Sequence, residues 1–335
     1  MSAGATSRSS RTSVSRDGTD AMGATLTEPV SRRPRWHGHR YNRAGLYRLA
    51  EALSVLPRGL RLALARQVAR LAPRVLPVER RATRKTLELI TGASGAGLDE
   101  LTAALFRDFA MCFADLVSTN RQPAARLSGL LGSVTGAEQF EGLPGGIVTV
   151  TAHVGNWELA GRLLATRLAR RTHVVVTAEE APELERWVRR NGEGVRFVPR
   201  DHPSVAVELL AALRRGEVVA LQADRALGTG GDVWIPFFGR PAPFPLGPFL
   251  LARAAGVPVV PAFCMLDPHH RYAVTIAPPI TVVRGEEERA ARAWVALLES
   301  VVREHPTQWF NFFDAWNPFG EPAPASGRSP GAGPA

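Results

Sequence analysis

Short apolar runs and amphipathic helical segments alternate through the second half of the chain. Runs rich in β-branched residues predict strands at 147–152, 173–178, 195–198, 218–222, 257–263 and 272–276. Apolar residues spaced three and four apart predict helices at 157–168, 182–190, 204–215 and 286–304. Strands that alternate with helices are typical of a mostly parallel sheet covered on both faces. The pattern therefore predicts an α/β protein with right-handed crossovers.

The residues ahead of this region carry helical patterns and no strand pattern. Residues 44–78 have an apolar stripe opposite a face rich in arginine, and we expect Pro57 and Pro73 to break this run into short helices. Further helices are predicted at 80–90 and 99–120. A basic amphipathic helix either lies in a membrane interface or packs on a core with its basic face in water. The pattern leaves both readings open.

The two ends of the chain lack the large apolar residues that a core requires. Residues 1–40 are rich in Ser, Thr, Gly and Arg and are mildly basic, and residues 321–335 are rich in Pro, Gly and Ser. We expect both ends to be disordered, which leaves one domain over residues 41–320. No uncharged apolar run reaches 18 residues, so neither a transmembrane helix nor a signal peptide is expected.

Composition adds an excess of positive charge. The formal net charge of the 335 residues is +10, and arginine supplies nearly all of it because Lys85 is the only lysine. Arginine binds phosphate groups bidentately, and such phosphates could belong to nucleic acid, anionic lipid or coenzyme A. No nucleic-acid-binding module accompanies the arginines, so we expect no nucleic-acid partner.

A histidine and a glutamate follow the strand predicted at 147–152, on the turn into the next helix. His153 lies at the carboxyl end of that strand, where open α/β sheets bind ligands, and histidine is a candidate base near neutral pH. Asn156 is a good N-cap, and the helix start offers backbone N–H groups to an oxyanion. Glu158 on the same turn can hold one ring nitrogen of His153. The alternative is a histidine that only caps a helix.

A second polar loop follows the strand predicted at 218–222. Asp224 lies at its carboxyl end, so this loop should face the His153 loop. Asp224, Arg225 and the glycines after them can bind phosphate or position a substrate, and a simple turn is the alternative. Phe237 and Phe238 could line a channel for an acyl chain, although aromatic residues at such spacing are more often part of the core.

Several catalytic chemistries lack their residues. No Gly-x-Ser-x-Gly elbow supports an esterase triad, and a single lysine without a glycine loop excludes a P-loop. The chain contains neither His-Glu-x-x-His nor a Cys-x-x-Cys pair, and no complete dinucleotide fingerprint. Cys112 and Cys264 lie in apolar stretches and are expected to be reduced core residues. We therefore expect no metal and no cofactor.

The spacing His153-x4-Glu158 resembles the catalytic motif of the glycerolipid acyltransferase superfamily. The phrase at 152–161 resembles the branch that contains the late acyltransferases of lipid A assembly and the phosphatidylinositol mannoside acyltransferases. The Phe-Phe-Gly phrase at 237–239 and the Pro-x-Gln-Trp segment at 306–309 resemble later parts of the same family. The likeness covers residues 46–318 and is not specific for the acceptor lipid.

The resemblance implies a glycerolipid acyltransferase-like fold and direct acyl transfer from coenzyme A or acyl carrier protein to a lipid hydroxyl. His153 would be the general base and Glu158 would orient it, while backbone N–H groups near Gly155 and Asn156 would hold the oxyanion. No enzyme nucleophile is needed because a thioester is already activated.

Relatives also keep substrate-positioning residues on the second loop and between the two loops. Asp224 and Arg225 match the first group. Arg190 is the best match for the second, with Arg189 and Arg200 as rivals.

Membrane attachment and the acceptor are open from the sequence. Relatives of the lipid A branch carry a hydrophobic anchor near the amino terminus, and residues 44–78 would replace it here, on the cytoplasmic face of the plasma membrane. A lipid A precursor, a mannosylated phosphatidylinositol, another glycolipid or a lysophospholipid would suit the same dyad. The alternative from another class is a non-catalytic lipid-binding or membrane-scaffold protein of the same fold.

Overall fold

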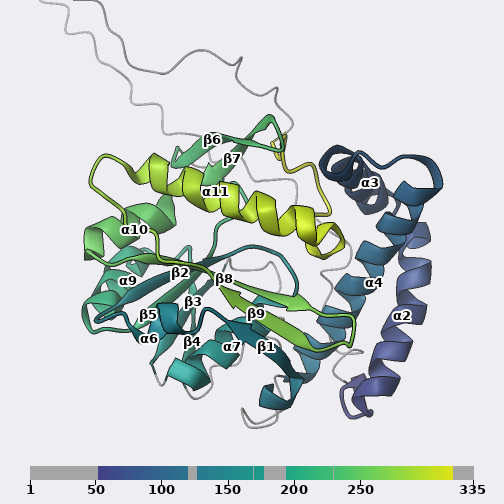
Figure 1. Cartoon of the computed structure of the whole chain (residues 1–335), viewed down its shortest axis with the longest axis horizontal. Helices are drawn as coiled ribbons and strands as arrows, with labels where there is room; N and C mark the ends of the chain where they lie inside the picture. Colours follow the sequence, from purple (N-terminus) through teal and green to yellow (C-terminus); the bar gives the residue numbers. More distant parts are fainter. Residues whose placement is uncertain (1–51, 120–126, 169, 177–193, 229, 320–335) are drawn as a thin grey trace, which may run out of the picture. The chain divides into compact units, whose positions relative to one another are not determined.

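A seven-stranded sheet forms the centre of the molecule (Figure 1). The computed structural model describes residues 52–119, 127–168, 170–176, 194–228 and 230–319, all within one compact unit of the chain. The strand order is β1-β9-β8-β2-β5-β3-β4. The strands are β1 (Leu131–Thr135), β2 (Ile147–Thr151), β3 (Thr172–Val176), β4 (Val195–Pro199), β5 (Val218–Gln222), β8 (Val259–Leu266) and β9 (Tyr272–Ile276).

Neighbouring strands are parallel at every pairing except that of β8 with β9. The mostly parallel α/β sheet predicted from the sequence is therefore confirmed. The edge strand β1 was not predicted, because its sequence Leu-Gly-Ser-Val-Thr lacks both an apolar run and a clear alternation. The tails expected to be disordered and the helix expected at 182–190 lie outside the described residues.

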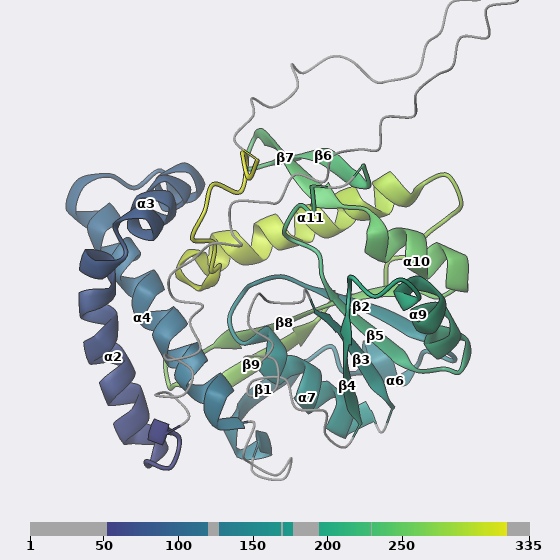
Figure 2. The same cartoon turned by 180° about the vertical axis from the view of Figure 1, so that it is seen from behind.

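Helices cover both faces of the sheet (Figures 1 and 2). The helices are α2 (Arg58–Val75), α3 (Pro77–Thr91), α4 (Gly95–Thr119), α6 (Glu138–Glu141), α7 (Trp157–Leu168), α9 (Val205–Arg214), α10 (Gly247–Ala255) and α11 (Glu287–Glu304). The chain crosses the sheet in one direction from β2 to β3 and in the other from β4 to β5. Right-handed crossovers therefore place α7 and α9 on opposite faces. The core is continuous between the layers, and Trp294 of α11 stacks on Phe263 of β8.

The prolines of the amino-terminal helices act differently from the expectation. α2 begins directly after Pro57, as expected, but it continues through Pro73 and ends at Val75. The break falls at Leu76, because the ring of Pro77 disfavours helical geometry at the residue before it. Pro77 then opens α3, where its missing N–H costs nothing.

A two-stranded ribbon, β6 (Asp232–Phe237) with β7 (Arg240–Pro245), was also not predicted. Four prolines lie in its strands, and proline argues against an interior strand. Both strands of a two-stranded ribbon are edges, so the missing N–H groups are tolerated. Phe238 and Gly239 have φ of 50° and 71°, so both central residues of the tight turn are left-handed.

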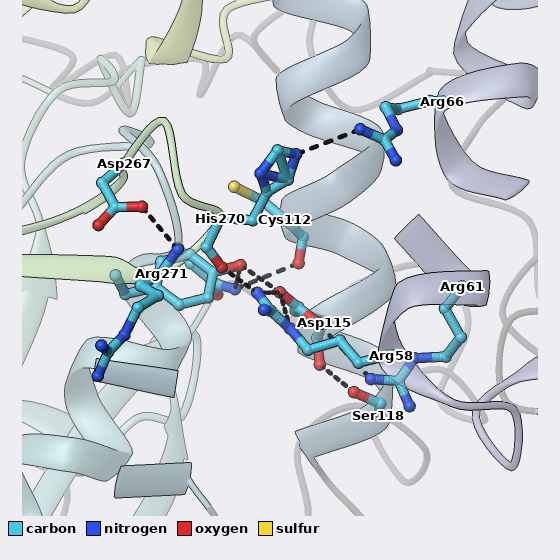
Figure 3. Close-up of polar contacts among 11 residues, drawn as sticks. Arg58, Arg61, Arg66, Cys112, Asp115, Ser118, Asp267, His270 and Arg271 are labelled. Atoms are coloured by element: carbon cyan, nitrogen blue, oxygen red, sulfur yellow. Dashed lines mark hydrogen bonds and ion pairs between the residues drawn. The ribbon is translucent and has the colours of Figure 1, made fainter. Parts of the chain in front are cut away.

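α2 packs along α4 over a buried polar cluster (Figure 3). The Asp115 side chain of α4 has no exposed surface. Arg58 donates to it with Nε to Oδ1 at 3.0 Å and Nη2 to Oδ2 at 2.7 Å, and Nη2 of Arg61 lies 3.7 Å from Oδ1. In the described part of the chain, no helix is both long and apolar enough to cross a membrane.

Candidate active site

His153 lies on the turn between β2 and α7, and the segment after α11 holds this turn. The N–H of Phe310 donates to the carbonyl of His153 at 2.8 Å, and the N–H of Gly155 donates to the carbonyl of Gln308 at 2.9 Å. Val154 and Trp309 form an antiparallel bridge between the two segments. The carboxyl end of the domain thus fixes the backbone around the histidine.

Gln308 anchors that segment to the end of β8. Its Oε1 accepts from the N–H of Leu266 at 2.9 Å, and its Nε2 donates to the carbonyl of Leu266 at 2.7 Å. Glutamine offers a donor and an acceptor on one planar group, so it can pair with both backbone groups of one residue. The Gln-Trp pair of the closing segment is therefore structural support for the His153 turn.

The backbone N–H groups of Gly155 and Asn156 are already bonded within the protein. Gly155 donates to Gln308 as described, and Asn156 donates to the carbonyl of Cys264 at 2.8 Å. The prediction that these two groups hold an oxyanion is therefore wrong, because neither donor is available. The side chain of Asn156 does cap α7 as predicted, accepting from the N–H of Leu159 at 3.4 Å.

Glycine is required at position 155. Its φ is +57°, and an added Cβ would lie 2.1 Å from the carbonyl oxygen of Cys264. Any side chain would therefore force β8 and the turn apart.

The carboxylate of Asp224 holds the ring of His153 at Nδ1, so this nitrogen is not the one that Glu158 could hold. Oδ1 of Asp224 lies 2.7 Å from Nδ1 of His153, and Oδ2 accepts from the backbone N–H of His153 at 3.0 Å. The indole N–H of Trp309 donates to Oδ2 at 3.1 Å. Thr151 of β2 pairs with Gln222 of β5, so the residues two positions further along each strand meet.

In the buried His153–Asp224 pair, the aspartate is ionised. Burial alone would raise the pKa of Asp224, but the charge and hydrogen bonds of His153 and the charge of Arg225 lower it to about 2. An ionised Asp224 fixes the proton of His153 on Nδ1 and leaves Nε2 as the basic nitrogen. The Asp224 side chain has no exposed surface, so we assign it to the positioning of His153. Its predicted contact with a substrate stays a prediction.

Glu158 lies in the first turn of α7, where a negative charge is stabilised by the helix dipole. Burial lowers the pKa of Arg162, one turn later in the helix, and the charge of Glu158 partly offsets this lowering. A role for Glu158 in the reaction stays a prediction.

Arg225 holds the segment after α11 next to the His153–Asp224 pair. Its Nη2 donates to the carbonyl of Phe310 at 2.9 Å, and its Nε donates to Oδ1 of Asn311 at 3.3 Å. The guanidinium also lies over the ring of Phe313, 5.3 Å from the centroid. Arg225 is thus near the site, but these bonds go to the protein. Arg190 lies outside the described residues.

The indole of Trp157 packs edge-on against the ring of His153, with centroids 4.8 Å apart. Its Nε1 is covered from solvent and has no hydrogen-bond partner among the described residues. A buried N–H without an acceptor costs about 1–3 kcal/mol, so such a group beside a candidate base calls for an explanation.

Most of the chain matches a known protein family. The model described as bacterial lipid A biosynthesis acyltransferase matches residues 44–317. The chain belongs to this family. It is therefore an acyltransferase, and the resemblance found in the sequence is confirmed.

The relatives of this acyltransferase include phosphatidylinositol mannoside acyltransferases. Those of Mycobacterium tuberculosis strains CDC 1551 / Oshkosh and H37Rv are 25% identical over 242 residues, which span 70% of this chain and 76% of theirs. That of Mycolicibacterium smegmatis is 25% identical over 175 residues, 51% of this chain and 57% of its own. The solved structure of the 1-acyl-sn-glycerophosphate acyltransferase PlsC from Thermotoga maritima covers 73% of this chain and 98% of its own, with 16% identity and a TM-score of 0.33.

The two phenylalanines predicted to line an acyl channel in the acyltransferase lie in different surroundings. Phe237 is fully buried in an aromatic cluster, with its ring 5.3 Å from that of Trp309 and stacked on Trp316. It is a core residue, so the channel prediction is wrong for it. The N–H of Phe238 donates to Oε2 of Glu299 at 2.7 Å, and its half-buried ring lies under Arg303.

Metal-ligating and thiol chemistry find no support in the described part of the acyltransferase. No group of three or more His, Cys, Asp or Glu side chains there has the geometry of a metal site. Cys112 and Cys264 are both buried and unpaired, and burial raises the pKa of each thiol. Both therefore remain protonated.

Two residues that support the His153–Asp224 pair carried no signal of their own in the sequence. Trp309 donates to Asp224, and Gln308 supports the turn, but the sequence showed them only as part of a family resemblance.

Proposed function

We propose that this acyltransferase moves a fatty acyl group from a thioester of coenzyme A or acyl carrier protein to a hydroxyl of a lipid acceptor, with His153 as general base. The observation that carries the proposal is the 2.7 Å bond between Nδ1 of His153 and a buried, ionised Asp224. Such a pair keeps one proton on Nδ1, so that Nε2 is the nitrogen that accepts a further proton, and it stabilises the imidazolium that forms.

The reaction needs no covalent enzyme intermediate. Nε2 of His153 takes the proton of the acceptor hydroxyl while its oxygen attacks the thioester carbonyl carbon. The tetrahedral intermediate then breaks its carbon–sulfur bond, and the imidazolium returns the proton to the leaving thiolate. The products are the acylated lipid and the free thiol, so atoms and protons balance.

The oxyanion of the tetrahedral intermediate requires a donor other than Gly155 or Asn156. We assign this role to the indole N–H of Trp157, which is unbonded among the described residues and lies on a ring in contact with His153. A donor kept from water stabilises a developing charge more strongly than one in solvent. The amino end of α7 adds its positive dipole end at the same place.

The acceptor is proposed to be a glycolipid or phospholipid, of the lipid A or phosphatidylinositol mannoside type. The mycobacterial relatives are named as phosphatidylinositol mannoside acyltransferases, which favours that type. We include Glu158 in the proposed site because it is the second member of the His-x4-Glu motif. Because Nδ1 of His153 is bonded to Asp224, Glu158 would act on a substrate group. Arg190 and Arg225 remain candidates for positioning the acceptor headgroup.

The exposed face of α2 supports a membrane surface as the place of work. Its apolar residues at helical spacing are exposed: Leu60 (49%), Leu64 (37%), Val68 (64%), Leu71 (59%) and Val75 (64%). The helix contains five arginines and no acidic residue. An apolar stripe flanked by cations fits an anionic lipid surface, and like charge disfavours a second copy of the same helix. We place the enzyme on the cytoplasmic face of the plasma membrane.

A reconstituted assay tests the reaction. Purified full-length enzyme is incubated with acyl-coenzyme A or acyl carrier protein thioester and with a mannosylated phosphatidylinositol or a lysophospholipid in anionic vesicles. Thiol release and the acylated lipid are measured together. The wild type should form both in equal amounts, and His153→Gln should form neither. If the folded wild-type protein binds the lipid but releases no thiol, the result would instead support a non-catalytic lipid-binding protein.

A further inference from the structure

The buried cluster under α2 reaches the turn that carries His153. On one side, Arg58 and Arg61 of α2 hold the carboxylate of Asp115 (Figure 3). On the other, the hydroxyl of Tyr272 donates to Oδ2 of Asp115 at 3.0 Å. The same hydroxyl accepts from Nδ2 of Asn156 at 3.1 Å. The hydrogen bonds therefore run without interruption from α2 to the residue that caps α7.

The direction of each hydrogen bond in this series follows from the donors and acceptors that its groups offer. Burial raises the pKa of the Tyr272 hydroxyl well above its ordinary range, so the hydroxyl keeps its proton and donates to the carboxylate. A hydroxyl has one donor and two acceptor positions, so it can donate to Asp115 while it accepts from Asn156. Removal of water strengthens all these bonds and makes an unpaired member costly.

Asn156 is the point at which the cluster meets the catalytic turn. Its Nδ2 also donates to the carbonyl of Cys112 of α4 at 3.2 Å, and its Oδ1 caps the amide of Leu159. The side chain thus fixes the first turn of α7, which carries Trp157, in relation to α4. The backbone of Asn156 lies three residues after His153.

We infer that Asp115 is a positioning residue that couples α2 to the catalytic turn through Tyr272 and Asn156. The inference rests on the proposed function for its consequence, because α2 also carries the exposed apolar stripe. Binding of that stripe to lipid fixes the position of α2 and therefore of Arg58 and Arg61. The hydrogen-bonded cluster then fixes the start of α7. The first turn of α7 is thus most ordered when the enzyme is bound to the lipid surface that holds its acceptor.

Two substitutions cut the cluster at opposite ends, and each has a matched control. Tyr272→Phe removes only the bridging hydroxyl, and its control, Thr102→Val, removes a buried hydroxyl of α4 that donates to the carbonyl of Leu98. Arg58→Gln removes the charge that holds Asp115 from α2. Its control, Arg289→Gln, removes an exposed arginine of α11 that pairs with Glu286. The double variant Arg58→Gln/Tyr272→Phe completes a cycle.

Acyl transfer is the first readout. Tyr272→Phe and Arg58→Gln should each lower kcat by about 3- to 30-fold with KM for the acceptor unchanged, the size expected for substitutions within a coupled network. The double variant should be no slower than the slower single variant, because both cuts break one chain. The two controls should retain wild-type kcat. Losses that multiply in the double variant, or equal losses in the controls, overturn the coupling.

Hydrogen exchange is the second readout and does not require activity. The amides of Leu159 and Ala160 are bonded to Asn156 and report on the first turn of α7. Their exchange should be about tenfold faster in Arg58→Gln and Tyr272→Phe and unchanged in both controls. Unchanged exchange in Arg58→Gln overturns the coupling even if acyl transfer is demonstrated. Faster exchange in a protein whose wild type acylates no lipid supports the coupling and removes the proposed function.

Discussion

Replacement of Asp224 with asparagine removes the charge beside Nδ1 of His153 and preserves the shape of the side chain. The pKa of Asp224 is lowered from an ordinary value of 3.8 to about 2, which corresponds to roughly 2 to 3 kcal/mol in favour of the carboxylate. His153 contributes most to that lowering, so a similar energy stabilises the imidazolium that forms during the reaction. Asp224→Asn should therefore lower kcat/KM on the order of 100-fold.

The pH dependence of kcat/KM gives the sharper assay. Without the negative charge the imidazolium is less stable, so the acid limb of the profile should move to lower pH. Glu217→Gln is the matched control, because Oε2 of Glu217 lies 2.7 Å from Nε2 of His173 at the amino end of the sheet. The control should keep wild-type kcat/KM. An Asp224→Asn enzyme within about threefold of wild type, with an unmoved acid limb, would refute the assigned pairing.

Four other perturbations have defined outcomes. Trp157→Phe should lower kcat by about 10²- to 10³-fold without loss of stability in urea, because it deletes a donor that has no acceptor in the folded protein; a stability loss with normal kcat contradicts the oxyanion role. Gly155→Ala should cost at least about 2 kcal/mol of unfolding free energy, given the left-handed φ and the 2.1 Å approach to Cys264. Val68→Glu/Leu71→Glu should reduce binding to phosphatidylglycerol vesicles at least about tenfold in flotation, with unchanged circular dichroism. The pKa of Glu217 is lowered to about 2 by Arg215 and His173, so its contribution to stability is present above pH 4.5 and lost as the pH falls toward 2; Glu217→Gln should flatten this acid slope of the unfolding free energy.

The sheet was largely predictable because its central strands are local apolar runs. β5 and β9 match their predicted bounds, and β2 and α7 agree within a residue. Strands that are buried on both faces must be apolar over their whole length, so their signal does not depend on partners. The β6–β7 ribbon gave no such signal, because its four prolines argue against strands. They are tolerated because, within the described residues, no further strand pairs with either side of the ribbon.

The contacts of the site were predictable only in part. That His153 and Asp224 lie on facing loops follows from their positions after two strands. That they bond follows from the register of β2 with β5, which pairs Thr151 with Gln222 and is set by tertiary packing. Glu158 is nearer in sequence, but nearness along a strand-to-helix turn does not place a carboxylate on Nδ1.

The oxyanion prediction failed for a related reason. The amides of Gly155 and Asn156 lie at a helix start, where helical acceptors are missing. Their actual acceptors, the carbonyls of Gln308 and Cys264, come from segments more than 100 residues away in the sequence. A local pattern cannot show that such donors are already bonded.

The most direct test of general-base acyl transfer by His153 is lipid mass spectrometry on cells that express the wild type or His153→Ala, with both proteins shown to be folded by circular dichroism. An acylated glycolipid or phospholipid should appear with the wild type and be absent with His153→Ala, and its mass would identify the acceptor and the acyl chain. The same acylated lipid at wild-type levels in cells with folded His153→Ala would contradict the role of His153.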